Sequence, residues 1–468
     1  MPVIVQAKGV TYGYPQHGYG LLSTSLEVHA GDAVLIAGPS GSGKSTLARC
    51  LSGLIPHLYR GNLSGEVWLD GLSTSVAPLW QLAERAGLVF QNPSVQMLTV
   101  TTEQEIIFGL ENLGLPPSTG EDRLEAALTH FGLEPFRRRS PQTLSGGEQQ
   151  KLALAAIMAR RPPVLVLDEP LSMLDSTAAL RLVAHVIDLA QAGTAVIICE
   201  HRSEYLRTIP NLRILHLNGS AAPTPDPSDV PPLPNRLSRV SRPTLNVDNL
   251  SIDLGDRPIL RDLSFAVQGG MVLAIVGRNG VGKTTLLRAL AGLQRYRGRI
   301  TVGGQEPDLG MVFQNPDLQF FNATVHDEVL YRLDDPDLGY YDWLITMLGL
   351  GRYGETPPLL LSEGEKKRLA LAVALMSDPR HGVLLDEPAL GQDATHKRVL
   401  LRLARALSQA GQLVIFATHD LGLAAEADRL LILSQDGIAA DGPPNELLNE
   451  DALWTRVGLV VPPWVASK

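Results

Sequence analysis

The chain has 468 residues, enough for two or three domains of ordinary size, and its 44% hydrophobic and 19% charged composition is typical of a globular protein. The net charge of −9 argues against broad nucleic-acid binding, and two cysteines, Cys50 and Cys199, are too few for a disulfide framework or a cysteine-rich zinc site. No apolar run approaches the roughly 20 residues of a membrane helix, and the first residues lack a signal-peptide pattern, so we expect a cytoplasmic chain without a span of its own.

The first motif of the first half is an apolar strand pattern, AVLIAG at residues 33–38, that runs into the glycine-rich loop GPSGSGKST. In such a loop the glycines let backbone N–H groups close around phosphate oxygens, and the start of the next helix adds positive potential. Lys44 would reach the terminal phosphates, and the Ser45 hydroxyl would be a ligand of Mg²⁺. The predicted phosphate-binding residues are Gly38, Pro39, Ser40, Gly41, Ser42, Gly43, Lys44, Ser45 and Thr46.

Three further motifs of the first half carry candidate catalytic or metal-binding side chains. VFQNP contains Gln91, a candidate ligand of a metal ion and of water. The strand pattern VLVLDEP delivers Asp168 to the metal, and the adjacent Glu169 would polarise the attacking water as general base. The strand pattern AVIIC precedes His201, which could hold the γ-phosphate or the attacking water.

The octapeptide LSGGEQQK, residues 144–151, lies between the glutamine motif and VLVLDEP. Ser145 and Glu148 have the spacing of a capping box, and a helical apolar run follows them, so the octapeptide is predicted to start a helix. A helix start is also an anion site. Ser145, Gly146, Gly147 and Glu148 are therefore candidate phosphate-binding residues.

Residues 220–243 contain seven prolines and no apolar periodicity, which predicts a semi-extended linker. The linker separates a predicted first domain, residues 1–219, from a second, residues 244–468. Each half alternates apolar strand patterns with helical patterns. This alternation predicts an α/β fold in which each domain has a mainly parallel sheet with helices on both faces.

The second half repeats the motifs of the first in the same order. Asp168 and His201 are 33 residues apart, as are Asp386 and His419. The predicted phosphate-binding residues of the second half are Gly277, Arg278, Asn279, Gly280, Val281, Gly282, Lys283, Thr284 and Thr285, together with Ser362, Gly364 and Glu365 of LSEGEKKR. The predicted metal ligands are Thr284, Gln314 and Asp386, and the predicted catalytic residues are Glu387 and His419.

The order of the motifs resembles that of the ATP-binding subunits of ABC transporters: phosphate loop, glutamine loop, LSGGE signature, LDEP and histidine. The resemblance implies two tandem P-loop ATPase domains, each with a helical signature subdomain, that hydrolyse ATP with Mg²⁺ to drive transport. In that family the phosphate loop of one module faces the signature of the other. Tyr14, with Tyr12 as the alternative, lies where the family stacks an aromatic ring on adenine, whereas the second half has Leu254.

The second signature departs from the family pattern, because Glu363 stands where the first half has Gly146. A carboxylate about 7 Å from a phosphate would cost about 2 kcal/mol at an effective dielectric constant near 20 if it pointed inward. We therefore expect moderate asymmetry between the two ATP sites. The hypothesis is that the site built on the second phosphate loop, which would face the intact signature, hydrolyses ATP faster.

A narrower resemblance links QNPSVQMLTVTTEQEIIFGLENLGLP and QNPDLQFFNATVHDEV to the ATPases of energy-coupling factor (ECF) importers, as does GLIPHLYRGNLSGEV. It implies two partners, a transmembrane scaffold subunit and a small substrate-binding membrane protein. It also implies a peripheral position on the cytoplasmic face of the cell membrane. The cargo would be a vitamin, a vitamin precursor or a metal ion, and pairing of the chain with itself stays open.

Two alternatives remain from the sequence. A fused monosaccharide-importer ATPase has a similar length but would not be expected to carry paired Gln-Asn-Pro-x-x-Gln runs. A soluble twin-ABC translation factor shares the duplication but typically has a longer, charged helical linker.

Overall fold

The structure is a computed structural model that describes residues 2–15, 20–39, 41–217, 241–255 and 257–466. Ser40 of the first phosphate loop and residues 220–240 of the predicted linker lie outside the described residues. The chain divides into two compact units, the first made of residues 1–174 and 178–222 and the second of residues 175–177 and 223–468. No helix in the described ranges is long and apolar enough to cross a membrane.

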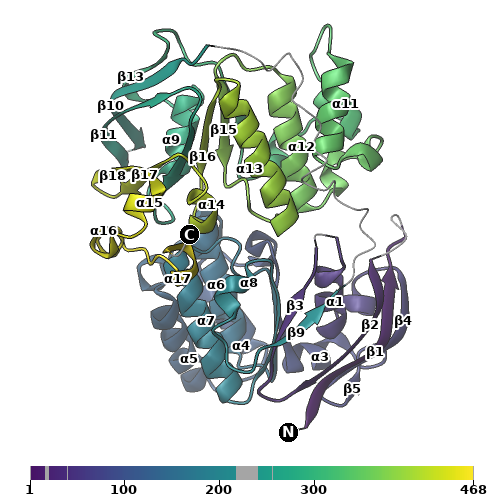
Figure 1. Cartoon of the computed structure of the whole chain (residues 1–468). Helices are drawn as coiled ribbons and strands as arrows, with labels where there is room; N and C mark the ends of the chain where they lie inside the picture. The colour runs from purple at the N-terminus through teal and green to yellow at the C-terminus, as the bar shows by residue number, and fades with distance from the viewer. Residues whose placement is uncertain (1, 16–19, 40, 218–240, 256, 467–468) are drawn as a thin grey trace. The chain divides into compact units, whose positions relative to one another are not determined.

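The first unit contains two sheets (Figure 1). An antiparallel sheet has the strand order β2-β1-β4-β5, and a parallel sheet has the order β6-β7-β8-β3-β9. The strands are β1 (Val3–Gly13), β2 (Leu21–His29), β3 (Ala33–Ala37), β4 (Asn62–Leu69), β5 (Leu72–Ser73), β6 (Ala86–Val89), β7 (Val164–Asp168), β8 (Ala195–Cys199) and β9 (Arg213–His216).

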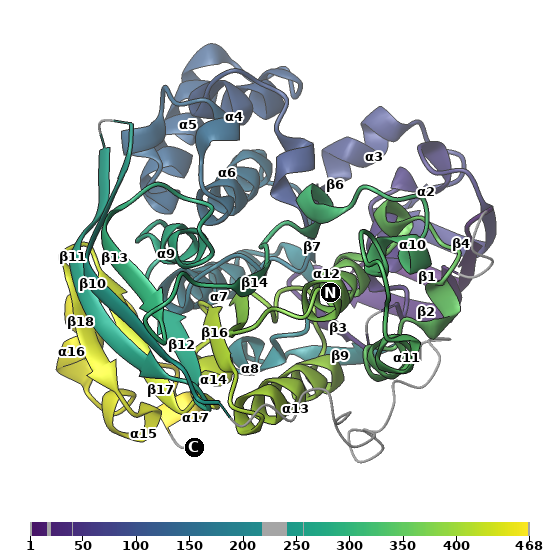
Figure 2. The same cartoon turned by 90° about the horizontal axis from the view of Figure 1, so that it is seen from above.

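The helices of this half pack on the sheets and on one another. They are α1 (Lys44–Leu51), α2 (Leu54–His57), α3 (Leu79–Arg85), α4 (Thr102–Glu111), α5 (Pro117–Phe131), α6 (Gly146–Ala159), α7 (Ser176–Gln191) and α8 (Ser203–Leu206). Helix α1 contacts strands of both sheets, so one apolar core joins them. Helices α4, α5 and α6 contact each other and form the helical subdomain seen in Figure 2.

The second unit repeats this plan. Its sheets have the orders β11-β10-β13 and β14-β15-β16-β12-β17-β18, and only the β17–β18 pair of the larger sheet is antiparallel. The strands are β10 (Thr244–Leu254), β11 (Arg257–Gln268), β12 (Val272–Val276), β13 (Arg297–Val302), β14 (Leu309–Val312), β15 (Gly382–Asp386), β16 (Leu413–Ala417), β17 (Arg429–Ser434) and β18 (Gly437–Gly442).

Two apolar cores cover the two faces of the larger sheet in this unit. Helix α9 packs in the core shared with the β11-β10-β13 sheet, and α12 and α13 pack in the other (Figure 1). The helices are α9 (Lys283–Leu290), α10 (Val325–Val329), α11 (Leu338–Met347), α12 (Glu363–Met376), α13 (Ala394–Gln409), α14 (Leu421–Ala424), α15 (Pro444–Leu447), α16 (Asp451–Val457) and α17 (Pro463–Ala466).

The central strands are short apolar runs without alternation because helices or the second sheet cover both of their faces. Every residue of β7, β8, β12, β15 and β16 is buried. The predicted α/β class is therefore confirmed. The parallel strands also end at one edge, and the phosphate loops, the glutamine motifs, the LDEP motifs and the histidines follow strands there, as ligand sites in open parallel sheets do.

Candidate functional site

The two phosphate loops need glycine for backbone reasons. Gly43 and Gly282 precede α1 and α9 with φ of 93° and 108°, in the left-handed region that side chains disfavour. A Cβ at Gly43 would lie 2.5 Å from the carbonyl oxygen of Gly20, and one at Gly282 would lie 2.8 Å from Leu260 Cδ2. The sequence thus folds each loop tightly against its own unit, and the loop leads into a helix, as a phosphate cradle requires.

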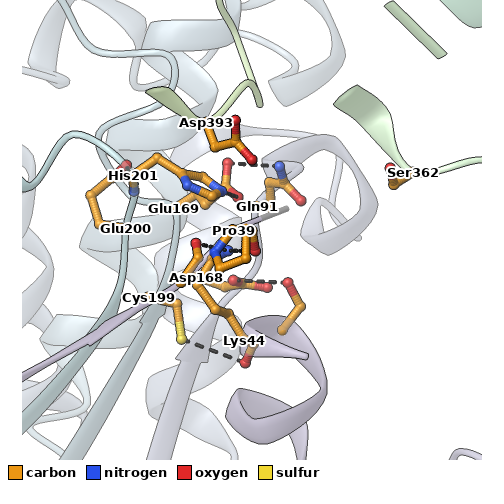
Figure 3. A network of polar contacts seen from close by, with 12 residues as sticks. Pro39, Lys44, Gln91, Asp168, Glu169, Cys199, Glu200, His201, Ser362 and Asp393 are labelled. Atoms are coloured by element: carbon orange, nitrogen blue, oxygen red, sulfur yellow. Dashed lines mark hydrogen bonds and ion pairs between the residues drawn. The ribbon is translucent and has the colours of Figure 1, made fainter. Parts of the chain in front are cut away.

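The two loop lysines are buried and held by the loops that they follow. Lys44 Nζ donates hydrogen bonds to the carbonyl oxygens of Gly38 at 3.0 Å and Pro39 at 2.9 Å (Figure 3). Lys283 Nζ donates to Gly277 O at 2.8 Å and to the next carbonyl at 3.2 Å. Each unit therefore holds one ammonium group at the phosphate loop, where it can bind an anion.

The two predicted metal-binding aspartates end the central strands β7 and β15 and are buried. Burial, with a further contribution from the adjacent Glu169, raises the pKa of Asp168 to about 6. Burial and the adjacent Glu387 likewise raise the pKa of Asp386 to about 6. Ser45 Oγ donates to Asp168 Oδ1 at 3.1 Å. Neither carboxylate oxygen of Asp386 has a partner with ordinary hydrogen-bond geometry among the described residues, although the Thr284 hydroxyl is near enough to lower the pKa of Asp386 against the effect of burial.

A divalent cation fits these residues. Buried carboxylate oxygens beside a hydroxyl are the donors that Mg²⁺ prefers, and an unpartnered buried carboxylate is costly without a cation or donor. Ser45 and Asp168 in the first unit, and Thr284 and Asp386 in the second, could supply these donors.

Both predicted catalytic glutamates adopt a left-handed backbone conformation that is uncommon outside glycine. Glu169 and Glu387 each have φ of 49°. Their amides donate to the carbonyl oxygens of Cys199 at 2.8 Å and Ala417 at 2.9 Å on the neighbouring strand. The chain therefore turns sharply out of the strand directly after each aspartate, and the carboxylate of the glutamate is aimed by this turn.

Each glutamate contacts the predicted histidine of its own unit. His201 Nε2 lies 3.3 Å from Glu169 Oε1, and His419 Nδ1 lies 2.9 Å from Glu387 Oε2. Burial raises the pKa of both glutamates, but the histidines and loop lysines outweigh it. The pKa of Glu169 is consequently held below its usual value, and that of Glu387, which Lys367 also lowers, falls to about 2. Both carboxylates are held in the ionised form that a proton acceptor needs.

The predicted glutamines follow strands β6 and β14 of the parallel sheets. Gln91 Nε2 donates to Glu169 Oε2 at 2.8 Å (Figure 3). Gln314 takes the matching place in the second unit, two residues after the end of β14. The structure thus brings Lys44, Asp168, Glu169, His201 and Gln91 together at one edge of the first parallel sheet.

The octapeptides start helices α6 and α12, as predicted, through a capping box in each half. Glu148 Oε2 accepts the Ser145 amide at 2.7 Å, and Glu365 Oε2 accepts the Ser362 amide at 2.8 Å. The Ser145 and Ser362 hydroxyls accept the amides three residues on, at 3.4 Å. The glutamate carboxylates are thus occupied by the caps, and nucleotide contacts by these octapeptides stay a prediction.

Glu363 is the first residue of α12, and its Oε1 lies 3.8 Å from Lys366 Nζ. In the first half, a Cβ added to Gly146 would lie 3.1 Å from Met173 Sδ. The position that matches Met173 in the second LDEP segment is Gly391. The second copy therefore has a larger residue at the helix start and a smaller one in the loop after the strand.

Tyr14 lies beside the first phosphate loop, and Tyr12 lies in the core. The Tyr14 hydroxyl accepts a hydrogen bond from Arg49 at 2.9 Å and is 3.3 Å from Thr46 Oγ1. Tyr12 is 1% exposed and donates to the carbonyl oxygen of Arg60. Of the two candidates for adenine stacking, only Tyr14 is partly accessible, and stacking itself stays a prediction.

Four side chains hold the loops after the glutamine motifs, and the sequence alone assigned a role to none of them, although Gln96 and Gln319 end the paired Gln-Asn-Pro-x-x-Gln runs. Gln96 bonds the backbone of Phe90 and Leu88, and Gln319 does the same for Phe313 and Met311. The buried carboxylates of Glu105 and Glu328 accept amides of residues 98–99 and 321–322 respectively. Their recurrence in both halves was the available signal.

Comparisons with known proteins place this site in a family. The family model described as "ABC transporter" matches residues 21–172 and 260–390. A protein of Treponema denticola named as an ABC transporter ATP-binding protein is 36% identical, with 88% of this chain and 92% of that protein covered. YkoD of Bacillus subtilis, named for HMP/thiamine import, is 33% identical over 91% of this chain and 89% of its own length.

The fold also matches a solved structure over most of the chain. The RNase-L Inhibitor matches with a TM-score of 0.65 at 20% identity, over 96% of this chain and 93% of that one. At this identity the match shows the fold alone. The family match and the similar relatives show that the chain belongs to the ABC transporter family. It is an ATP-binding protein with two tandem ABC domains, and it is an ATPase.

Proposed function

We propose that the chain is the ATPase subunit of an ECF-type importer on the cytoplasmic face of the membrane. A transmembrane scaffold and a small substrate-binding membrane protein would be its partners, and a vitamin, vitamin precursor or metal ion its cargo. The paired Gln-Asn-Pro-x-x-Gln runs and the 33% identity to a relative named for HMP/thiamine import support this proposal and favour a thiamine-related cargo.

The observation that carries the proposal is an apolar groove of about 590 Å³ in the first unit. It lies between α3, the loop after the glutamine motif, and the helical subdomain. Its lining includes the exposed side chains Trp80, Val95, Leu98 and Phe108. A large exposed apolar patch marks a protein interaction site, and a groove of this kind suits an apolar face of a partner helix.

The groove also reaches the chemistry. Phe90, which precedes Gln91, and Gln96, which ends the Gln-Asn-Pro-x-x-Gln run, line it. Gln91 in turn bonds the Glu169 carboxylate. A helix seated in the groove would therefore press on the loop that positions this carboxylate. That contact gives a membrane partner a short physical route to the rate of ATP hydrolysis.

The residues at the sheet edges have the following proposed roles. Lys44 and Lys283 bind the terminal phosphates, while Glu169 and Glu387 accept the proton of the attacking water, which His201 and His419 orient. Mg²⁺ would be held in the first unit by Ser45, Gln91 and Asp168, and in the second by Thr284, Gln314 and Asp386. Bound Mg²⁺ neutralises phosphate charge that develops during hydrolysis.

The test is affinity purification of the tagged chain from detergent-solubilised membranes of its source, with mass spectrometry of the bound proteins. A polytopic scaffold and a small substrate-binding membrane protein are expected. The matched variant Leu98→Asp should lose them while its ATP binding and thermal stability stay at wild-type values. Ribosomal proteins without membrane partners, or unchanged recovery of the scaffold by Leu98→Asp, would refute the proposal.

A further inference from the structure

The two signature helices differ at one buried position close to the predicted catalytic glutamates. The seventh residue of each octapeptide is Gln150 in α6 and Lys367 in α12. Gln150 is fully buried, and Lys367 is 4% exposed. A lysine is rarely buried to this degree unless its charge has partners, so this lysine needs an explanation.

Lys367 donates a hydrogen bond from Nζ to the backbone carbonyl oxygen of Glu387 at 2.7 Å. Burial lowers the pKa of Lys367 to about 8, and the carboxylates of Glu387, Asp386 and Glu363 oppose this lowering. The ammonium therefore has one direct acceptor and three carboxylates in its surroundings. Its buried charge is compensated by the two acidic residues at the end of β15.

The bonded carbonyl belongs to the residue with the unusual backbone. Glu387 has φ of 49°, and a conformation of this kind persists only where the surroundings fix it. A hydrogen bond to its carbonyl oxygen restrains the rotation of the peptide that follows. It thereby restrains the direction in which the Glu387 carboxylate leaves the chain.

Among the described residues of the first unit, Gln150 makes no hydrogen bond that corresponds to the one from Lys367 to the Glu387 carbonyl oxygen. Neither the amide nitrogen nor the oxygen of the Gln150 side chain has a hydrogen-bond partner among the described residues. Glu169 has the same φ of 49°, but its carboxylate is held from the side-chain end, by Gln91 at 2.8 Å. In both units the glutamate carbonyl oxygen accepts an amide three residues on, from Ser172 at 3.1 Å and from Leu390 at 3.2 Å, and the carboxylate contacts a histidine. The second unit differs because Lys367 adds a side-chain donor to that carbonyl oxygen.

We infer that Lys367 is a positioning residue for ATP hydrolysis in the second unit, holding the Glu387 peptide so that the carboxylate faces the attacking water. The inference rests on the proposed role of Glu387 as the proton acceptor. It assigns Lys367 no contact with the nucleotide. Gln150 has no corresponding role in the first unit.

The test compares ATP turnover of Lys367→Met, Lys367→Arg and Gln150→Met with the wild type. Methionine keeps the volume of the side chain and removes the hydrogen-bond donor. In Lys367→Met, kcat should therefore fall about tenfold while KM for ATP changes less than about twofold. This is the result expected when a charged hydrogen bond that orients a reacting group is lost. A cavity of about 30 Å³ beside Lys367 leaves room for arginine, which should restore most of kcat. Gln150→Met should behave as the wild type.

A double variant separates positioning from general stability. If Lys367 acts through Glu387, then Lys367→Met/Glu387→Gln should turn over ATP no more slowly than Glu387→Gln alone. Multiplied losses, an effect confined to KM, an unchanged kcat for Lys367→Met, or an equal loss for Gln150→Met would overturn the inference. Wild-type turnover by Glu387→Gln would instead refute the role of Glu387 on which it rests.

Discussion

The two units share their backbone chemistry and differ in the polar side chains behind it. Both have glycines of positive φ in the phosphate loop and a glutamate with φ of 49° after the strand. Behind them, Ser94 bonds Gln149 at 2.8 Å in the first unit, and the matching pair Asp317 and Lys366 is an ion pair at 2.8 Å in the second. The two units therefore share the backbone turns that shape the site and differ in the side-chain pair that lies behind it.

The histidine motifs differ in the opposite sense, because there the first unit carries the extra charge. The buried Glu200 accepts the amides of Leu171, His201 and Arg202 at 2.7 to 3.0 Å. In the second unit Thr418 takes its place and its hydroxyl donates to Glu387 Oε2 at 3.3 Å. Glu200 thus joins the histidine motif to the segment after Glu169, whereas Thr418 joins it to the Glu387 carboxylate itself. The two sites are therefore related but not interchangeable.

The largest expected effect tests what the units share. Lys44→Ala and Lys283→Ala should each weaken ATP binding to their own unit at least tenfold, since each removes the charged donor of one loop. Equilibrium dialysis with ATP should find two sites per wild-type chain and one tight site in each variant. Loss of both sites in either variant would show that the units do not bind ATP independently.

A second prediction concerns the difference between the first residues of α6 and α12. Gly146→Glu should destabilise the first unit by about 1 kcal/mol, because its Cβ would lie 3.1 Å from Met173 Sδ and the methionine must move. Adding Met173→Gly, which copies the Glu363 and Gly391 pair, should recover part of that loss. Thermal unfolding measures both variants. A single variant as stable as the wild type, or a double variant less stable than the single one, would contradict this account of the pair.

The smallest expected effect concerns the polar pair behind the glutamine loop. Lys366→Gln and Asp317→Ser should each cost about 1 kcal/mol or less, and the double variant, which restores the first unit's pair, should cost less than their sum. Denaturant unfolding at low and at high salt measures the coupling. Additive losses at both salt concentrations would show that the ion pair contributes nothing to stability.

The sequence predicted the fold and the places of the motifs well, for a physical reason. Apolar runs such as residues 164–168 can be covered on both faces only in a parallel sheet with helices, and parallel strands end at one edge. Hence Asp168 and His201, 33 residues apart, meet with Glu169 between them. The capping boxes at Ser145 and Ser362 were readable because their contacts span three residues.

The rest depends on contacts between distant segments that no spacing reveals. The approach of Met173 to Gly146 and that of Lys367 to Glu387 depend on how the loop after the strand packs on the signature helix. The octapeptide comparison identified Glu363 as the main difference between the halves. The structure instead shows two further substitutions, at Lys366 and Lys367, as buried charges. Their partners could be identified only from the packing.

The most direct measurement of the asymmetry between the units is steady-state ATP turnover of Glu169→Gln and Glu387→Gln, assayed side by side. Each change keeps the shape and removes a general base, which contributes about 10²- to 10⁴-fold to such reactions. Because Glu387 is held by His419 and two buried lysines, Glu387→Gln should lower turnover more than Glu169→Gln. Equal losses, or a larger loss for Glu169→Gln, would contradict the account.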